Sequence, residues 1–499
     1  MTTLFTNARI HGTAATAMAV ADGRIAWLGA EYPGTADQTV DLDGGFVAPA
    51  FVDAHVHATA AGLLRTGLDL TGATALSDVL DAVRDRVLAN PGTLLSGHGW
   101  DETRWPENRP PSRAELDSVA GATPVYLSRV DVHSALASTA LVDLVPAART
   151  ASGWSADGPL AGDAHHHVRR AARDSITPEQ RRAAQLSFLR HAASMGIACV
   201  HECGGPDISG ADDFADLLAI EGALPQVFGY WGAFGELPAG AHGLAGDLFV
   251  DGAFGSRTAA LREPYTDRPD TSGTRYLIAD QIADHLVACS ERGIQAGFHV
   301  IGDAGADAVL EGFDLAEERV GTQVLTGVRH RLEHLEMIDI DHAYRLGSLG
   351  VVASVQPLFD AYWGGAHGMY AQRLGEKRAN GLNRFAHLRE AGVQLAFGSD
   401  APVTAVDPWA TVRAAVQHNT QIFGLSADDA FTAHTTGGWR AAGDTDFLAG
   451  RLVTGAAATF AVWDAPDLVN GLPPLDRSPT CLRTVHNGTT IHEVSHGTP

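Results

Sequence analysis

The chain has 499 residues, of which 45% are hydrophobic and 19% are charged, a composition typical of a globular protein rather than a disordered or fibrous one. Its net charge of −24 repels nucleic acids and anionic membrane surfaces, so neither is expected as a partner. Only one lysine, Lys377, stands among the 35 basic residues, so a mechanism that needs a lysine has a single candidate.

The chain ends carry no sign of export or membrane insertion. The first residues, MTTLFTNARIHG, lack the basic and apolar regions of a signal peptide, and no apolar run of about 18 residues occurs anywhere. The four cysteines are too few for a disulfide framework. We therefore expect a cytoplasmic protein, and the sequence leaves open whether identical chains associate.

The two ends of the chain have similar patterns. Residues 1–48 contain short β-rich stretches separated by turn signals such as ADGR and DLDGG, and residues 445–499 contain further β-rich stretches. Chain ends often lie close together in space. We therefore predict one small composite β-sandwich, built from 1–48 and 445–499.

Between the ends, residues 49–444 alternate strand-like and helix-like stretches. Eight strand-like runs separated by helices predict an α/β fold, a (β/α)8 TIM-like barrel. The gap between the first two runs is too long for one helix, so an inserted α/β subdomain is expected at about 62–175. The runs are 46–57, 196–203, 224–233, 247–253, 294–302, 327–335, 350–357 and 393–402.

Metal-ligating residue types stand at the ends of these runs, where barrel enzymes have their active sites. The first run ends in His55 and His57, whose side chains share one face of a strand because alternate residues point the same way. The fifth run carries His299, the sixth His334 and the eighth Asp400. Histidines and an aspartate that converge on one mouth predict a divalent metal site, with zinc as the first candidate.

Seven segments spread over nearly the whole chain carry motifs of a known family. They are PAFVDAHVH (49–57), GWDETRWPENRPPSRAELD (99–117), PVYLSRVDVHSALAST (124–139), VDGAFGSRTAAL (250–261), HVIGDAGAD (299–307), HRLEHLEM (330–337) and FGSDAPV (397–403). On these motifs the sequence resembles the amidohydrolase superfamily. Within it, the sequence is similar to amidohydrolase family 3, which includes YtcJ-like proteins and N-substituted formamide deformylases.

The resemblance implies a β-sandwich beside a barrel and a hydrolase that uses metal-activated water. By position, His55 and His57 bind the more buried ion together with Asp400. His299 and His334 bind a second ion, or one of them serves a site with one ion. Asp400 orients the water, takes its proton and passes it to the leaving amine. The substrate class implied is a small N-acyl or N-formyl amine, cleaved at a non-peptide C–N bond.

The sequence departs from the family at one ligand position. Many members bridge two metals with a carboxylated lysine on the fourth strand, four residues before the DG of a DGxxGSR motif. Here that DG is Asp251-Gly252, and the position holds Asp247, which offers the same carboxylate on a shorter side chain. Lys377 lies in a loop-like stretch before the eighth strand. Asp247 can therefore bridge two ions, bind one ion, or stay solvated beside a mononuclear site.

Five further residues are candidates for substrate binding. His133 reaches over the mouth, or caps a local structure, and Gln356 ends the seventh strand near the substrate. Trp100 and Asp101 line the pocket, or serve packing and a turn. Arg257 holds a substrate carboxylate with its planar fork, or forms a salt bridge that stabilises its loop.

Two other groups of histidines and cysteines have plainer interpretations. His165, His166 and His167 form a tract that resembles a metal-binding segment, but we predict a solvated loop there. His201 and Cys203 share one face of the second strand, and we expect them to pack or to form hydrogen bonds near the site.

The sequence thus predicts a metal-dependent hydrolase whose partner is a small-molecule substrate. Two alternatives stay open. One is a deaminase or cyclic amidohydrolase, since the same metal-centred chemistry serves those reactions on the same barrel. The other is a relative that binds a small molecule at a degenerate site without catalysis, which the missing fourth-strand lysine would suggest.

Overall fold

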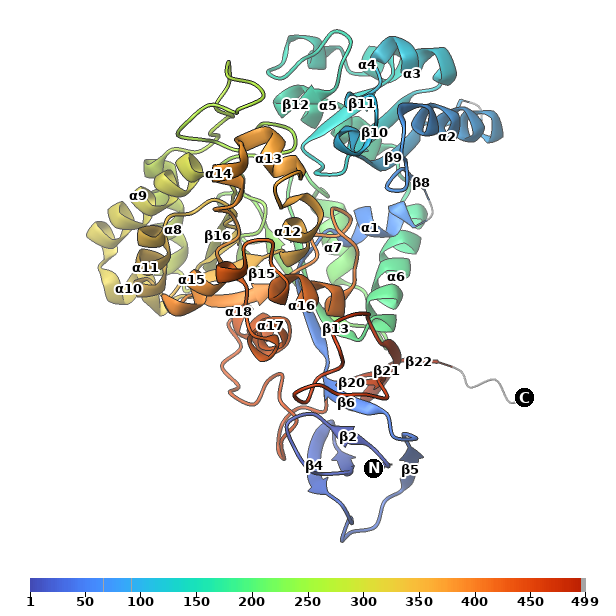
Figure 1. Ribbon diagram of the computed structural model, residues 1–499, viewed down its shortest axis with the longest axis vertical. Helices are drawn as coiled ribbons and strands as arrows, with labels where there is room; N and C mark the ends of the chain where they lie inside the picture. The colour runs from blue at the N-terminus through green and yellow to red at the C-terminus, as the bar shows by residue number, and fades with distance from the viewer. Residues whose placement is uncertain (66, 91, 495–499) are drawn as a thin grey trace.

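A computed structural model describes residues 1–65, 67–90 and 92–494 of the chain. Figure 1 shows a β-sandwich near both ends of the chain, a central barrel, and an inserted subdomain on the far side of the barrel. The predicted fold class is therefore confirmed.

The barrel is a single parallel sheet of eight strands in the order β19-β18-β17-β16-β15-β14-β13-β7. A bridge between Val56 and Ala401 joins the two edges just beyond the strands, so all carboxyl ends surround one mouth. The strands are β7 (Phe51–Val56), β13 (Ile197–Gly204), β14 (Gln226–Trp231), β15 (Ala241–Leu244), β16 (Gln295–Val300), β17 (Arg331–His334), β18 (Val352–Val355) and β19 (Gln394–Phe397).

The fourth barrel strand differs from the prediction. The sequence analysis placed it at 247–253, but β15 ends at Leu244. Gly246 has a φ of +80°, which turns the chain out of the ladder, and only an isolated bridge between Phe249 and His299 pairs the following segment. Asp247 consequently lies in a loop at the mouth rather than on the strand.

Helices cover the outside of the barrel. The α6 helix (Pro178–Ser194) begins where the sequence predicts, because the Thr177 hydroxyl accepts a hydrogen bond from the Gln180 N–H and the Gln180 side chain accepts one from the Thr177 N–H. The other helices of the barrel domain are α7 (Ala211–Leu218), α8 (Ala279–Glu291), α9 (Asp303–Val320), α10 (Thr322–Gly327), α11 (Ile340–Ser348), α12 (Pro357–Trp363), α13 (Met369–Leu374), α14 (Glu376–Ala379), α15 (Phe385–Glu390), α16 (Pro408–Val416), α17 (Ala427–Ala433) and α18 (Thr436–Ala441). Two of them, α12 and α13, lie at the mouth and line a cavity there.

The sandwich combines both ends of the chain in two sheets. One sheet, β4-β3-β1-β5, comes from the N-terminal end, and the other, β2-β6-β20-β21-β22, pairs β6 antiparallel with β20 from the C-terminal end. The rings of Phe5 and Phe460 pack edge to face between them. The strands are β1 (Thr2–Thr6), β2 (Arg9–Ile10), β3 (Ala17–Ala21), β4 (Arg24–Gly29), β5 (Gln38–Asp41), β6 (Phe46–Pro49), β20 (Phe460–Asp464), β21 (Thr480–His486) and β22 (Thr489–Glu493).

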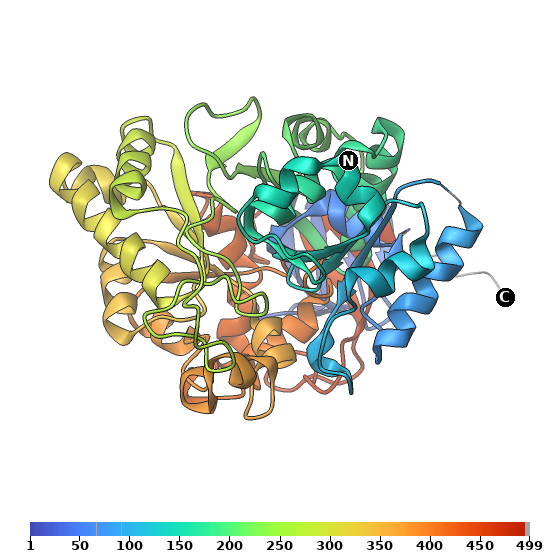
Figure 2. The same ribbon diagram turned by 90° about the horizontal axis from the view of Figure 1, so that it is seen from above.

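The inserted subdomain has its own five-stranded sheet, β12-β11-β10-β9-β8. It lies between α1 (Ala58–Leu64) and α6 in the chain, and in Figure 2 its teal segments lie in front of the barrel in the view from above. The strands are β8 (Leu68–Asp69), β9 (Leu95–Trp100), β10 (Val125–Arg129), β11 (Ser134–Ala137) and β12 (Leu160–Ala161), with helices α2 (Leu76–Ala89), α3 (Arg113–Ala120), α4 (Thr139–Leu144) and α5 (Gly162–Asp174).

Within the described ranges, no helix combines the length and the apolar character that crossing a membrane would require.

Phe51, the first residue of β7, joins the bottom of the barrel to the sandwich. Its fully buried ring packs against Trp409, Phe431 and Trp463, with centroids 5.2, 5.4 and 5.8 Å away. We expect Phe51→Ala to lower the free energy of unfolding by about 3–5 kcal/mol, because it leaves a cavity among these rings. Urea unfolding followed by circular dichroism measures the change. Phe447→Ala is the matched control, since Phe447 is 74% exposed, and an equal loss in both variants would contradict the packing role.

Candidate metal centre

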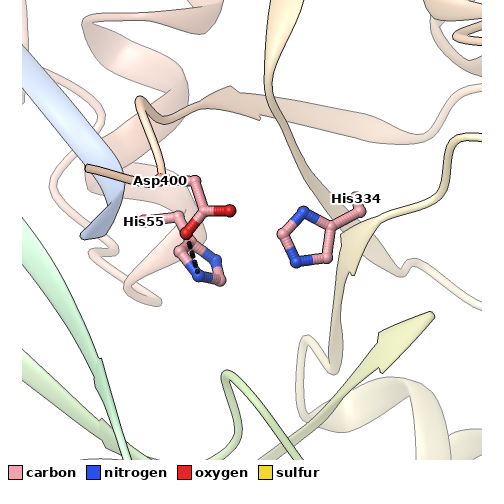
Figure 3. A group of neighbouring side chains, drawn as sticks. All are labelled: His55, His334 and Asp400. Carbon is pink, nitrogen blue, oxygen red and sulfur yellow. Dashed lines mark ion pairs between the residues drawn. The ribbon is translucent and has the colours of Figure 1, made fainter. Parts of the chain in front are cut away.

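Six buried side chains, four histidines and two aspartates, meet at the mouth of the barrel. Each comes from the end of a barrel strand or from the residues just after it. Figure 3 shows His55, His334 and Asp400 with their polar atoms turned toward one another. The full set is His55 on β7, His57 after it, Asp247 after β15, His299 on β16, His334 at the end of β17 and Asp400 after β19. The five ligands predicted from strand ends are thus brought together with Asp247.

Asp247 lies between the histidines in spite of its short side chain. Its Oδ1 is 3.5 Å from Nε2 of His55 and 3.9 Å from Nε2 of His334, and its Oδ2 is 3.3 Å from Nε2 of His57. Asp247 stands on the loop after β15, and its carboxylate reaches three of the histidines from there. Of the three arrangements that the sequence left open, the solvated one does not occur, since Asp247 is buried.

Asp400 contacts the same pair of histidines from the eighth strand. Its Oδ1 is 3.4 Å from Nε2 of His55 and 3.1 Å from Nε2 of His57. Asp400 has a φ of +53°, and His334 has one of +72°, a conformation uncommon for residues other than glycine. The Asp400 N–H donates to the carbonyl of His55 (2.8 Å), and a Cβ at Gly398 would lie 2.5 Å from the His55 nitrogen. This close approach of two strands holds the strained ligand in place.

Hydrogen bonds at the far side of two imidazoles set which nitrogen faces the centre. Nδ1 of His55 donates to Glu333 (2.9 Å), and Nδ1 of His334 donates to Oε1 of Gln356 (2.7 Å). Burial raises the pKa of Glu333, but the Arg331 guanidinium and the hydrogen bond from His55 lower it to about 2, so this carboxylate stays ionised. Both imidazoles therefore turn Nε2 toward the centre, and Nε2 is the nitrogen that would bind a metal ion in place of a proton.

The charges of the cluster shift its pKa values strongly. Burial lowers the pKa of His57, but Asp247 and Asp400 outweigh it and raise the value to about 10. In the same way Asp247 raises the pKa of His334 to about 9 against burial. The neighbouring imidazoles hold the pKa of Asp247 well below its usual range, although burial opposes them. The aspartates thus favour the positively charged form of the neighbouring histidines, and the histidines favour the negatively charged form of Asp247.

Several polar atoms of the cluster are buried and have no hydrogen-bond partner in the described part of the chain. They are Nε2 of His55, the Nδ1 atoms of His57 and His299, and the Oδ1 atoms of Asp247 and Asp400. Each such atom destabilises the fold by about 1–3 kcal/mol unless something pairs with it. A divalent cation accepts lone pairs from nitrogen and oxygen ligands at once, so the residues present fit such an ion.

The donor atoms divide into overlapping groups that are small enough to hold an ion. In each group the ligand atoms lie within 4.8 Å of one another. Asp247 belongs to two of the groups. The groups that involve the six residues are His55 with His57 and Asp247, Asp247 with His299 and His334, and His55 with His334 and Asp400.

His201 and Cys203 of β13 lie behind this cluster. Arg331 donates a hydrogen bond to Nδ1 of His201 (3.1 Å), in keeping with the predicted packing role. Cys203 lies within reach of His55 and Glu333, but burial raises the pKa of its thiol well above the usual value. In that group the Glu333 carboxylate is already held by Arg331 and by Nδ1 of His55.

His133, predicted to reach over the mouth, does so. It follows β10 in the inserted subdomain, and its ring lies 5.1 Å from that of His299 and 5.5 Å from that of Phe249. Burial lowers the pKa of His133 to about 4, so its imidazole is neutral at pH 7. It lines both of the cavities at the mouth.

Trp100 and Asp101 line neither of these cavities. The Trp100 indole donates to the carbonyl of Leu127 (2.9 Å) in the core of the inserted subdomain. Asp101 pairs with the buried Arg129 (3.1 Å), which also binds Asp131, two residues before His133. The structure therefore places both residues in positions that support the loop over the mouth.

Arg257 and Gln356 also lie outside the cavity linings. The guanidinium of Arg257 forms a salt bridge with Asp267 (2.7 Å), which matches the second interpretation offered for it. Gln356 contacts the centre through His334, because its Oε1 accepts a hydrogen bond from the Nδ1–H of that histidine.

The prediction of a solvated loop at His165–His167 is wrong. The tract lies on α5, where His165 is buried and its Nε2 is 2.9 Å from the hydroxyl oxygen of Tyr126. The helix forms because Ala164, Val168 and Ala172 recur at intervals of four and pack into the subdomain core. This spacing is visible in the sequence, but the neighbouring Gly and Asp residues concealed it. Four residues that line the first cavity were not named as site candidates from the sequence: Val132, His166, Arg169 and Phe249.

A parallel barrel with histidines and aspartates gathered at its mouth is an arrangement that metal-dependent hydrolases use. A comparison with protein families matches residues 38–492 to the family described as amidohydrolase family, Amidohydro_3. The chain belongs to this amidohydrolase family.

Its curated relatives are distant but span most of its length. The YtcJ protein of Bacillus subtilis (strain 168), named as an amidohydrolase, is 25% identical over 81% of this chain and 81% of the relative. The N-substituted formamide deformylase of Arthrobacter pascens is 25% identical over 85% of this chain and 84% of the relative. The protein LONG AFTER FAR-RED 3 of Arabidopsis thaliana is 27% identical over 90% of this chain and 85% of the relative.

Solved structures agree with this assignment. An uncharacterised metal-dependent hydrolase from Pyrococcus horikoshii OT3 has a TM-score of 0.72 and 25% identity, covering 94% of this chain and 99% of that one. A similar hydrolase from Pyrococcus furiosus has a TM-score of 0.69 and 25% identity, covering 93% of this chain and 98% of that one.

We expect protein purified without a metal-affinity tag to retain a divalent ion, and removal of the ion by a chelator to lower its melting temperature. An ion present at about 100 times its Kd stabilises the folded state by about 2.7 kcal/mol. Elemental analysis and thermal unfolding measure both effects. His55→Ala should lose the ion, whereas the control His367→Ala, at an exposed histidine, should keep it. Absence of any ion after zinc or manganese supplementation would contradict a metal centre.

Proposed function

We propose that the protein hydrolyses a non-peptide C–N bond of a small N-acyl or N-formyl amine, and that two zinc ions serve the reaction. The position of Asp247 carries the proposal, because its two oxygens contact histidines of both ligand groups. A carboxylate in that place can bridge two ions, as the carboxylated lysine does in the relatives that the sequence resembles. The name of the Arthrobacter relative supports the type of bond.

When bound, a divalent ion at this site supplies a water of lowered pKa and polarises the scissile carbonyl. The side chains of the protein then have separate tasks. Asp400 holds the attacking water through its free carboxylate oxygen, accepts the proton, and passes it to the nitrogen of the leaving amine. Its buried position near His55 and His57 fixes the direction of that transfer.

Residues around the centre position the substrate. The neutral His133 imidazole, 5.1 Å from the ring of His299, can donate a hydrogen bond to the oxygen that gains charge as the carbonyl is attacked. Glu333 and Gln356 keep the two imidazoles turned toward the centre through their Nδ1 hydrogen bonds. The loop from Asp131 to His133 covers the mouth, which limits the access of bulk water.

Asp400→Asn should reduce turnover by at least about 10²–10⁴-fold, because the amide keeps the shape but cannot accept the proton. Circular dichroism should show an intact fold, and turnover is measured by release of amine from N-formyl and N-acyl amines. The control is Asp428→Asn, at an exposed aspartate on α17, which should keep full activity. Unchanged turnover in Asp400→Asn would exclude the proposed proton transfer.

Asp247→Ala should lower the number of bound ions from two per chain to one or none, since it removes the ligand shared by two of the donor groups. Elemental analysis gives the count, and anomalous scattering locates the ions. Two ions retained in this variant would exclude a bridging role. One ion in the unaltered protein, on His55, His57 and Asp400, would support a mononuclear site and shift the proposal toward a deaminase or cyclic amidohydrolase, for which ammonia release or ring opening is the assay.

A further inference from the structure

An arginine of the inserted subdomain faces the metal centre without a protein partner. Arg169 is half-buried on α5 and lines the cavity at the mouth together with His57, Asp247 and Asp400. Among the described residues it forms no hydrogen bond and no ion pair. No other arginine or lysine of the described chain lines either cavity at the mouth.

The other arginines near the mouth are all neutralised. Arg129 pairs with Asp101, Glu102 and Asp131, and all four are buried. Arg257 and Arg373 share Asp267, and Arg373 also reaches Glu102. Each of these arginines is paired with carboxylates, whereas the half-buried Arg169 is not. Its guanidinium has five hydrogen-bond donors, and their free positions indicate a site for an anionic ligand.

A histidine one turn earlier on the same helix faces the same cavity. His166 stacks on Phe249 with ring centroids 6.4 Å apart, and both line the cavity. Burial and the charge of Arg169 lower the pKa of His166, so its imidazole is neutral at pH 7 and can donate one hydrogen bond. The two side chains are three residues apart on a helix and therefore lie next to each other.

A second cavity adjoins the first at the metal centre. It shares His133, His299, His334 and Asp400 with the first cavity, so the two meet at the ligands. Its remaining wall is mostly apolar and aromatic, and it includes Phe254, Phe359, Trp363, Met369, Tyr370 and Val403. A molecule bound at the centre can therefore reach Arg169 in the first cavity and the apolar wall of the second cavity, the apolar chamber.

We propose that the substrate is an amide that bears a carboxylate on one side of its scissile bond and an apolar, preferably aromatic, group on the other. Arg169 binds the carboxylate with its planar fork, helped by a hydrogen bond from His166, and the apolar chamber takes the other group. This inference rests on the proposed function and names its substrate class. It makes Arg169 a specificity-determining residue, because the net charge of −24 otherwise opposes an anionic ligand.

Binding of a compound that cannot be hydrolysed tests the carboxylate site apart from catalysis. The probe is 3-benzoylpropionate, in which a methylene replaces the nitrogen of N-benzoylglycine, and its methyl ester is the neutral counterpart. Calorimetry on the metal-loaded protein should show tighter binding of the acid than of the ester. Arg169→Gln should weaken binding of the acid by about 10–100-fold and leave the ester within about twofold, since a hydrogen bond to a charged group is worth that much.

Arg170→Gln is the matched control on the same helix. Arg170 is exposed and pairs with Asp207 (2.7 Å), so its loss removes the same charge without changing the cavity. Both ligands should bind this variant as they bind the unaltered protein. Arg169→Lys should restore only part of the affinity for the acid, because lysine keeps the charge but not the fork.

Steady-state kinetics with two amide substrates then show whether the substrate carboxylate lies on the amine side or on the acyl side of the scissile C–N bond. N-benzoylglycine carries it on the amine side and N-benzylsuccinamic acid on the acyl side, and Arg169→Gln should raise KM for the one that is cleaved. Equal binding of acid and ester, an equal loss of both in Arg169→Gln, or no binding of either would overturn the inference. Hydrolysis of neutral amides together with such a result would leave the proposed function standing. Binding that depends on Arg169 without hydrolysis of any amide would instead refute the proposed function.

Discussion

The structure depends on one electrostatic constraint, the convergence of six buried side chains, several of whose polar atoms have no hydrogen-bond partner in the described protein. Two aspartates among them bring negative charge into a space that water hardly reaches. Neighbouring side chains and backbone hydrogen bonds hold the six side chains in their positions. Arg331 holds Glu333, Glu333 turns His55, and the strained backbone of Asp400 is held against β7. A divalent cation would pair with these atoms and balance the aspartates, which is why the centre points to metal-dependent chemistry.

An aspartate stands at the position where the resemblance to the family implies a carboxylated lysine. Asp247 lies on a loop that leaves the ladder at Gly246, and its short side chain reaches the centre from that loop. The carboxylate still contacts His55, His57 and His334. The single lysine of the chain, Lys377, is exposed on α14 and takes no part in either cavity at the mouth.

Much of this could be predicted from the sequence, because the ends of parallel strands must meet at one edge. His55, His57, His299, His334 and Asp400 were found that way, and the eight-strand barrel with them. The fourth strand was misplaced because the apolar run after Gly246 resembles a strand but pairs only through one bridge. The roles of Arg169 and His166 could not be found, since no local pattern shows how the inserted subdomain packs over the mouth. Arg257 matched a motif, yet its partner Asp267 could be seen only in space.

The sandwich built from both chain ends affects the order in which the molecule can be completed. Strand β6 leads directly into β7, which carries His55, but its partner β20 is synthesised only after the whole barrel. During translation the edge of β6 therefore stays open until the last strands leave the ribosome. An open edge of this kind attracts other strands, so a truncated chain would be prone to aggregation even though every metal ligand had already been made.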